Sequence, residues 1–93
     1  MTSTPATTAT APTTDAVLVL SCPDQRGIVA AVSALLFDHG ANIEESQQFD
    51  DVRTDQFFMR IRFSVSAGGP DVGRWRELFA DVAARFDMQW QIR

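Results

Sequence analysis

The strongest constraint in this sequence is the strict alternation of residues 56–65. Every second position in this stretch is apolar: Phe57, Met59, Ile61, Phe63 and Val65. Successive side chains of a β-strand point to opposite faces, so the pattern predicts a strand whose two faces meet different surroundings. One face belongs to a hydrophobic core, and the other carries mainly polar and charged side chains.

Two segments before this strand carry patterns of their own. Residues 16–20 are a short apolar run that residues 22–24 (Cys-Pro-Asp) interrupt, which is typical of a buried strand. Residues 27–39 have apolar side chains at helical spacing, and Gly40 follows them where a left-handed helix terminator is expected.

The remaining segments complete the set of elements. Residues 42–50 are β-like but alternate poorly, so we predict a strand at a sheet edge, and residues 50–54 are a polar turn. Asp71 stands where it can cap the next helix. That helix has an apolar stripe at helical spacing: Trp75, Leu78, Phe79, Val82 and Phe86. Residues 88–92 alternate again and predict a last strand.

The predicted order is β-α-β-β-α-β, in which each helix joins two strands and the middle strands form a hairpin. With right-handed crossovers this order gives an α+β, ferredoxin-like fold, a four-stranded antiparallel sheet with both helices on one face. We expect the second helix to pack on the apolar side of residues 56–65. The opposite side includes Phe58, Arg60 and Arg62, which either face solvent or contact another domain or protomer.

Residues 1–14 are almost entirely Thr, Ala, Ser and Pro and show no apolar periodicity. We predict a disordered tail over residues 1–14 and one folded domain over residues 15–93. The tail lacks the basic and apolar regions of a signal peptide, and the apolar stretch at residues 27–37 is shorter than the roughly 20 residues that span a bilayer. We therefore expect a cytoplasmic protein with no membrane partner.

Charge and reactive side chains exclude several classes of function. The formal net charge of −4 argues against a nucleic-acid partner, because such proteins normally carry a basic surplus. The single cysteine, Cys22, cannot form an intramolecular disulfide. The single histidine, His39, lies at the end of a predicted helix, where a cation complements the helix dipole. We predict no catalytic residue, no metal site and no cofactor in this chain.

The turn at residues 21–27 is the best candidate for a binding site. It joins a buried strand directly to a helix that begins near Gly27, and the free N–H groups of that helix N-terminus suit a carboxylate. Asp24 lies beside them and suits an ammonium group. An α-amino acid is a ligand with both a carboxylate and an ammonium group. The alternative is structural: Asp24 caps the helix, and Gly27 permits close packing.

Three segments resemble an ACT domain, a small βαββαβ regulatory module that binds amino acids. They are residues 22–30 (Cys-Pro-Asp-Gln-Arg-Gly-Ile-Val-Ala), 40–43 (Gly-Ala-Asn-Ile) and 57–60 (Phe-Phe-Met-Arg). The first and last together resemble more narrowly the N-terminal ACT domain of formyltetrahydrofolate deformylases, which hydrolyse 10-formyltetrahydrofolate to formate and tetrahydrofolate. Arg26 departs from the ACT pattern, because many ACT domains have proline there.

The resemblance implies an effector site for a small amino acid, with methionine or glycine as the expected ligand, in one-carbon and purine metabolism. It assigns six residues to that site, four in the first loop and two at the start of the second strand: Asp24, Arg26, Gly27, Ile28, Asn42 and Ile43. It also implies a formyltransferase-like catalytic domain, C-terminal in the same polypeptide, none of which lies within these 93 residues.

Three alternatives remain: a stand-alone amino-acid sensor, the ACT domain of a phosphoserine phosphatase, and an interaction domain of the same fold that binds no ligand. The strand at residues 57–60 favours the deformylase. A folded domain this small, with an unprotected edge strand at residues 42–50, is also predicted to form a homo-oligomer.

Overall fold

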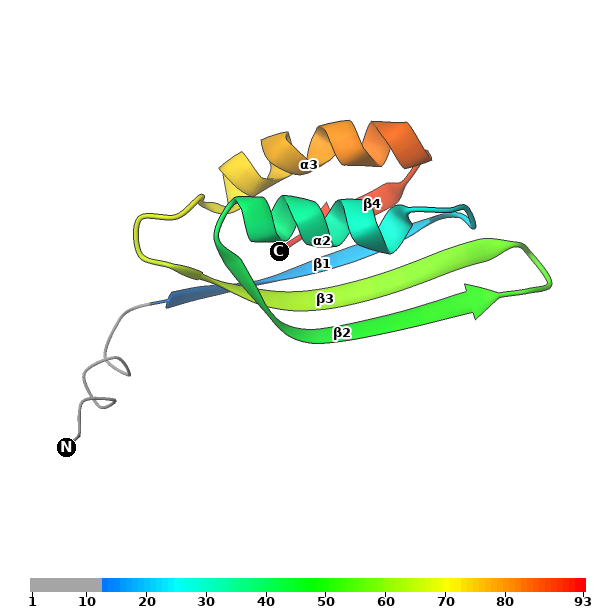
Figure 1. Cartoon of the computed structure of the whole chain (residues 1–93), viewed down its shortest axis with the longest axis horizontal. Coiled ribbons are helices and arrows are strands. Elements are labelled where there is room, and N and C mark those ends of the chain that lie inside the picture. The colour runs from blue at the N-terminus through cyan, green and yellow to red at the C-terminus, as the bar shows by residue number, and fades with distance from the viewer. Residues whose placement is uncertain (1–12) are drawn as a thin grey trace.

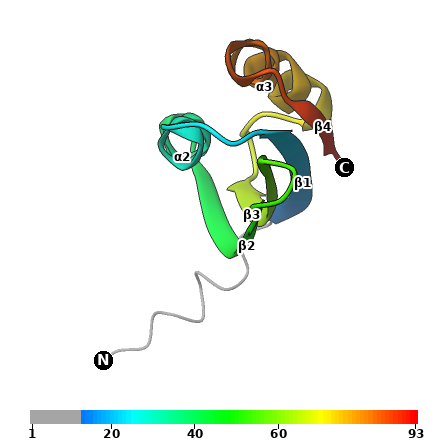
Figure 2. The ribbon, with the colours of Figure 1, turned by 90° about the vertical axis from the view of Figure 1, so that its right-hand side faces the viewer.

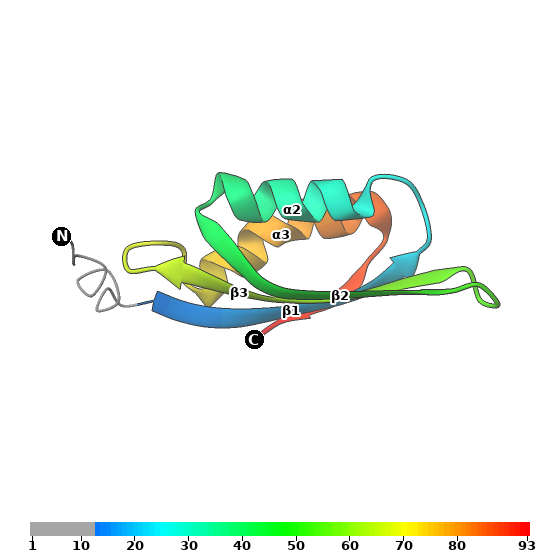
Figure 3. The same cartoon turned by 60° about the horizontal axis from the view of Figure 1, so that its bottom comes forward.

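The computed structural model describes residues 13–93, which form four strands and two helices in the predicted order (Figure 1). The elements are β1 (Thr13–Pro23), α2 (Ile28–Asp38), β2 (Ala41–Asp51), β3 (Gln56–Ser66), α3 (Val72–Phe86) and β4 (Gln89–Ile92). The strands form one antiparallel sheet in the order β2-β3-β1-β4. Both helices lie over the same face of the sheet (Figure 3). The predicted ferredoxin-like fold is confirmed.

The longest pairing in the sheet joins the two central strands, β1 and β3. It runs without interruption from the Thr13–Ser66 pair to the Pro23–Gln56 pair. β1 therefore begins two residues before the predicted domain boundary, because Thr13 and Thr14 continue the pairing alongside the end of β3. The rest of the predicted tail, residues 1–12, lies outside the described residues.

The core lies between the sheet and the two helices, which Figure 2 shows side by side. The alternate apolar residues of β3 are all buried and share one core with the apolar stripe of α3. α3 itself lies over β1 and β4, and Trp75 is the residue that reaches β3. The rings of Phe63 and Trp75 are in edge contact, with centroids 5.1 Å apart. α2 contributes Ile28, Val32 and Leu36. Within residues 13–93 no polar or charged side chain is buried, so apolar contact holds the helices on the sheet.

β2 lies at one edge of the sheet and contains a bulge. Ile43 pairs with a residue on the helix side of β3, whereas Glu45 pairs with one on the opposite side, so the register shifts at Glu44. Odd-numbered residues face the helices before the shift, and even-numbered residues face them after it. Ile43 and Phe49 share a parity in the sequence but lie on opposite faces, which explains the poor alternation of residues 42–50.

The two helices begin differently. α3 is capped by Asp71, whose carboxylate Oδ1 accepts the backbone N–H of Arg74 at 2.8 Å. α2 is preceded by Gly27, and no side chain caps its first turn. At the N-terminus of α2, no capping side chain therefore accepts a hydrogen bond from the first backbone N–H groups.

Replacement of Asp71 tests the cap on α3. We expect Asp71→Ala to lower the free energy of unfolding by about 1 kcal/mol, because the Arg74 N–H loses its acceptor. Asp81→Ala is the matched control, since Asp81 is an exposed carboxylate on the same helix, and it should change stability by less than about 0.5 kcal/mol. Urea denaturation followed by circular dichroism measures both, and equal losses would mean that the cap contributes nothing specific.

Candidate functional site

Gln25 holds the loop between β1 and α2 in place. Its side-chain Nε2 donates to the carbonyl oxygen of Pro23 at 2.8 Å and to that of Phe86, the last residue of α3, at 3.0 Å. The backbone N–H of Asp24 donates to the carbonyl oxygen of Asp55, beside the start of β3, at 2.9 Å. The loop is thus tied to two other parts of the fold on either side of the α2 N-terminus. Sequence analysis missed Gln25, because Phe86 lies 61 residues away along the chain.

Gly27 has a φ of +89°, in the left-handed region that side chains disfavour. A Cβ atom added there would meet only the Phe86 ring, at 4.0 Å, which is ordinary contact. The backbone conformation, and not close packing, is therefore the reason for glycine at this position.

The other loop residues of the predicted site differ in exposure. Asp24 does not cap α2, and within residues 13–93 its exposed carboxylate makes no hydrogen bond or ion pair. Arg26 is also exposed, whereas Ile28 is buried in the core. The side chains of Asp24 and Arg26 are thus open to a ligand, and Ile28 can offer only its backbone N–H.

Asn42 and Ile43 lie at the opposite end of α2 from this loop. Pro23, at the end of β1, pairs with Gln56 of β3, whereas Asn42 pairs with Ser64. These positions are eight residues apart along β3, or roughly 26 Å at a rise of about 3.3 Å per residue. One chain alone therefore does not bring the two halves of the predicted effector site together.

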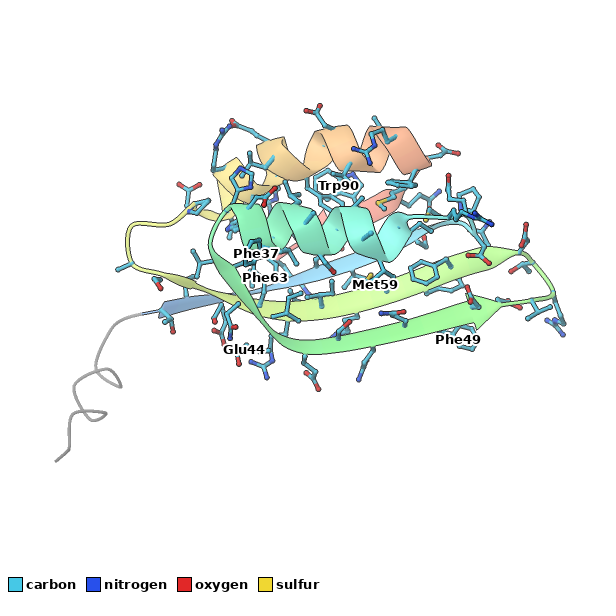
Figure 4. The ribbon with its side chains drawn as sticks, in the orientation of Figure 1. Phe37, Glu44, Phe49, Met59, Phe63 and Trp90 are labelled. Atoms are coloured by element: carbon cyan, nitrogen blue, oxygen red, sulfur yellow. The ribbon has the colours of Figure 1, made fainter. Side chains whose placement is uncertain are left out.

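The Asn42 side chain belongs to a small hydrogen-bonded group on the sheet face away from the helices, which we call the open face. Ser64 Oγ donates to Glu44 Oε2 at 2.7 Å, and Asn42 Nδ2 donates to the same oxygen at 2.8 Å. Figure 4 shows Glu44 near the start of β2. The bond from Ser64, followed by that from Asn42, lowers the pKa of the Glu44 carboxyl, and the charge of Arg62 adds to the effect. Asn42 Oδ1 makes no hydrogen bond within residues 13–93 and can accept one.

The surroundings of His39 and Cys22 indicate structural roles for both residues. The His39 ring lies in edge contact with Trp75, with centroids 6.0 Å apart, and its Nδ1 is 3.0 Å from the carbonyl oxygen of Leu35. Cys22 is buried at the end of β1, and burial raises the pKa of its thiol, with smaller contributions from the charges of Asp24 and Asp87. A protonated, buried thiol is a poor nucleophile.

The three predicted interface residues lie together on the open face. Phe58 is 40% exposed. The Arg62 guanidinium is 3.6 Å from the carboxylates of both Asp15 and Glu45, and that of Arg60 is 3.8 Å from Glu45. The two arginines are therefore paired with carboxylates of their own chain.

Comparison with known proteins places the fold and the loop in a family. The model of the ACT domain family matches residues 16–74. This chain belongs to the ACT domain family. It is 49% identical over 76 residues to the formyltetrahydrofolate deformylase of Bacillus subtilis, a match that covers 81% of this chain and 25% of that protein. The crystal structure of the Burkholderia mallei formyltetrahydrofolate deformylase matches with a TM-score of 0.79 and 40% identity, over 85% of this chain and 27% of that one.

A third relative is close to this chain in length. A UPF0237 protein of Methanopyrus kandleri is 39% identical over 64 residues, which are 69% of this chain and 69% of that protein. The match thus spans about a quarter of the Bacillus subtilis deformylase and most of the UPF0237 protein. In residues 13–93, no helix is long and apolar enough to cross a membrane.

The lowered pKa of Glu44 leads to a pH prediction. The folded state favours the ionised carboxylate, so its stabilisation is complete above the pKa of the unfolded chain and is lost as the pH falls through the lower folded pKa. We expect Ser64→Ala to raise the pKa of Glu44, measured from its side-chain carboxyl carbon by NMR. Ser66→Ala, two residues along the same strand, is the control and should leave this titration unchanged. An unshifted Glu44 in Ser64→Ala would contradict the assigned bond.

Proposed function

We propose that this chain is the amino-acid-binding regulatory domain of a formyltetrahydrofolate deformylase, the enzyme that hydrolyses 10-formyltetrahydrofolate to formate and tetrahydrofolate. The observation that carries the proposal is the 49% identity with the Bacillus subtilis deformylase. The hydrolysis takes place in a C-terminal catalytic domain. The ACT domain regulates the enzyme by binding an effector. The enzyme acts in the cytoplasm and takes part in one-carbon and purine metabolism.

The effector is a small amino acid, methionine or glycine. Its carboxylate accepts hydrogen bonds from the first N–H groups of α2, which no side chain caps. Its ammonium group meets the unpaired carboxylate of Asp24. Gln25 keeps the loop in the position that lets one ligand reach both.

The second half of the site comes from another copy of the chain. The loop precedes the N-terminal end of α2, and Asn42 follows its C-terminal end. Two α2 helices packed antiparallel about a twofold axis therefore place Asn42 of one copy beside the loop of the other. Asn42 Oδ1 is then a further acceptor for the ligand ammonium group.

The surface of α2 supports this packing. Residues 28–37 contain no charged side chain, although Val29 is 37% exposed and Phe37 is 80% exposed. A helix that is apolar on all sides is normally covered. Ala30 and Ala34 are exposed and small, so a second helix can approach closely. α3 is different, because its exposed residues include five charged ones: Arg74, Arg76, Glu77, Asp81 and Arg85.

A stand-alone amino-acid sensor is the second candidate function. It is favoured by the UPF0237 relative, since that match covers 69% of a protein of similar length. The two candidates share the effector site and differ in whether a catalytic domain belongs to the same polypeptide.

Titration of methionine and glycine by calorimetry tests the effector site. We expect Asn42→Ala to weaken binding about 10–150-fold, because a charge-assisted hydrogen bond is lost, while the fold survives. Gln89→Ala removes another exposed amide, on β4, and should bind as the wild type does. Equal affinities of the wild type and Asn42→Ala would place the site elsewhere.

Replacement of Phe37 tests whether two copies of the chain form the effector site together through α2. We expect Phe37→Glu to abolish the α2 contact, because it puts a carboxylate into an apolar interface, and to abolish effector binding with it. Val52→Glu is the matched control, since Val52 is an 89% exposed apolar residue in the β2–β3 turn. Sedimentation velocity measures the mass. A Phe37→Glu variant that retains the wild-type mass and affinity would exclude a site completed through α2.

A further inference from the structure

A cavity of about 220 Å³ lies beside the N-terminus of α3. The segment from β3 to α3, residues 67–71, forms one wall of the cavity, and the start of β1 forms another. Figure 1 shows this segment at the end of the molecule opposite the loop between β1 and α2. Neither that loop nor Asn42 lines the cavity, so it is separate from the proposed effector site.

The wall at residues 66–69 is a tight turn of fixed shape. The Gly69 N–H donates to the carbonyl oxygen of Ser66 at 2.9 Å, and Gly68 has a φ of +90°. A Cβ atom added at Gly69 would clash with Cγ1 of Val65. The backbone of the turn thus lies directly against Val65, which only glycine permits, and this wall of the cavity is formed without a ligand.

The side chains that line the cavity are mostly apolar. Ala16, Val65, Val72 and Trp75 supply this apolar surface. The lining contains no arginine, lysine or histidine, and Asp71 is its only charged residue. Because the Asp71 carboxylate already occupies the positive end of the α3 dipole, an anionic ligand would meet a negative charge without a compensating cation.

Trp75 brings a hydrogen-bond donor without a partner to the lining of this cavity. The residue is 1% exposed. Its Nε1 is the one buried side-chain nitrogen or oxygen in residues 13–93 that makes no hydrogen bond. Buried donors without a partner are rare, because a donor removed from water needs another acceptor. An acceptor atom held in the cavity against Trp75 is the partner that residues 13–93 do not supply.

Asp71 offers an acceptor one helical turn before this donor. Its Oδ1 accepts the Arg74 N–H in the cap of α3, whereas its Oδ2 makes no hydrogen bond within residues 13–93. The Asp71 carbonyl oxygen accepts the backbone N–H of Trp75 at 2.9 Å, so the two residues belong to the same turn. A ligand that reaches both side chains must therefore carry an acceptor for Trp75 and a donor for Asp71.

We propose that this cavity binds a neutral cyclic amide about one ring in size. The amide carbonyl oxygen accepts a hydrogen bond from Trp75 Nε1, the amide N–H donates to Asp71 Oδ2, and the ring packs on the apolar lining. An apolar cavity of about 150 Å³ accepts benzene, so about 220 Å³ is enough for a substituted ring. Simple lactams and pyrimidine bases share this amide edge, and the test includes one of each.

The test follows the two tryptophan indole N–H signals of the chain by two-dimensional NMR. The probes are 2-piperidone and uracil. We expect both amides to shift the Trp75 signal downfield and to leave the signal of Trp90 unchanged, since Trp90 does not line the cavity. Cyclohexanone, which lacks the N–H, should bind about 10-fold more weakly or worse than 2-piperidone, because it cannot donate to the Asp71 carboxylate. Piperidine lacks the carbonyl oxygen and should leave the Trp75 signal in place.

Two variants separate the two hydrogen bonds. Asp71→Asn keeps a side-chain oxygen for the cap of α3 and loses the carboxylate acceptor, so 2-piperidone should bind about 10-fold more weakly or worse. Trp75→Phe loses the indole donor and should bind about 2–10-fold more weakly, measured from the backbone N–H signals of Gly68 and Gly69. Trp90→Phe is the matched control, because it removes an indole outside the cavity, and it should bind as the wild type does.

Two results overturn the proposal. The first is a wild-type chain whose Trp75, Gly68 and Gly69 signals stay in place up to the solubility limit of both amides. The second is an affinity that Asp71→Asn and Trp75→Phe leave unchanged. Asp71→Asn decides alone if Trp75→Phe does not fold.

Methionine and glycine distinguish this cavity from the proposed effector site. Neither amino acid should shift the Trp75 indole signal, and Asp71→Asn should bind both as the wild type does. Failure of the effector site therefore leaves the binding of 2-piperidone and uracil intact, and failure of the cavity leaves the binding of the amino acids intact.

Discussion

The uninterrupted pairing of β1 with β3 is the constraint on which the rest of the structure depends. Each strand is 11 residues long and central in the sheet, so the pairing assigns every side chain of both strands to one of two faces. The helices cover one face, and the four apolar residues that β1 buries there are Ala16, Leu18, Leu20 and Cys22. The open face receives the remaining positions, including Val19 and Phe58, which is why apolar groups on central strands stay accessible.

The parts of the fold that the sequence predicts well are those whose pattern is local. The alternation of β3 and the apolar stripe of α3 depend only on spacing along the chain, and both elements lie within a residue or two of the predicted ranges. β1 is longer than the predicted run at residues 16–20. Apart from the buried Cys22, its outer residues are polar or exposed. They are extended by pairing with β3, a contact with residues far along the chain that no local pattern reveals.

The residues of the candidate site also differ in whether the sequence alone reveals them. Asp24 and Gly27 are recognisable from the sequence, because a strand that runs directly into a helix leaves a helix N-terminus open beside them. The partners of Gln25 and Asn42 are not recognisable, because they depend on the position of Phe86 and on the pairing of β2 with β3. The separation of the loop from Asn42 follows from the length of α2, since the chain must travel along the whole helix before β2 begins.

The bulge at Glu44 has a consequence for the free edge of β2. A strand that adds to a sheet edge needs backbone donors and acceptors at regular spacing. The bulge divides this edge into two runs, residues 41–43 and 45–51, that are out of phase with each other. An added strand that pairs with one run is misaligned with the other, so strand addition cannot continue along the full edge. The irregularity that blurs the sequence pattern of β2 therefore also guards the chain against fibril growth from its longest exposed edge.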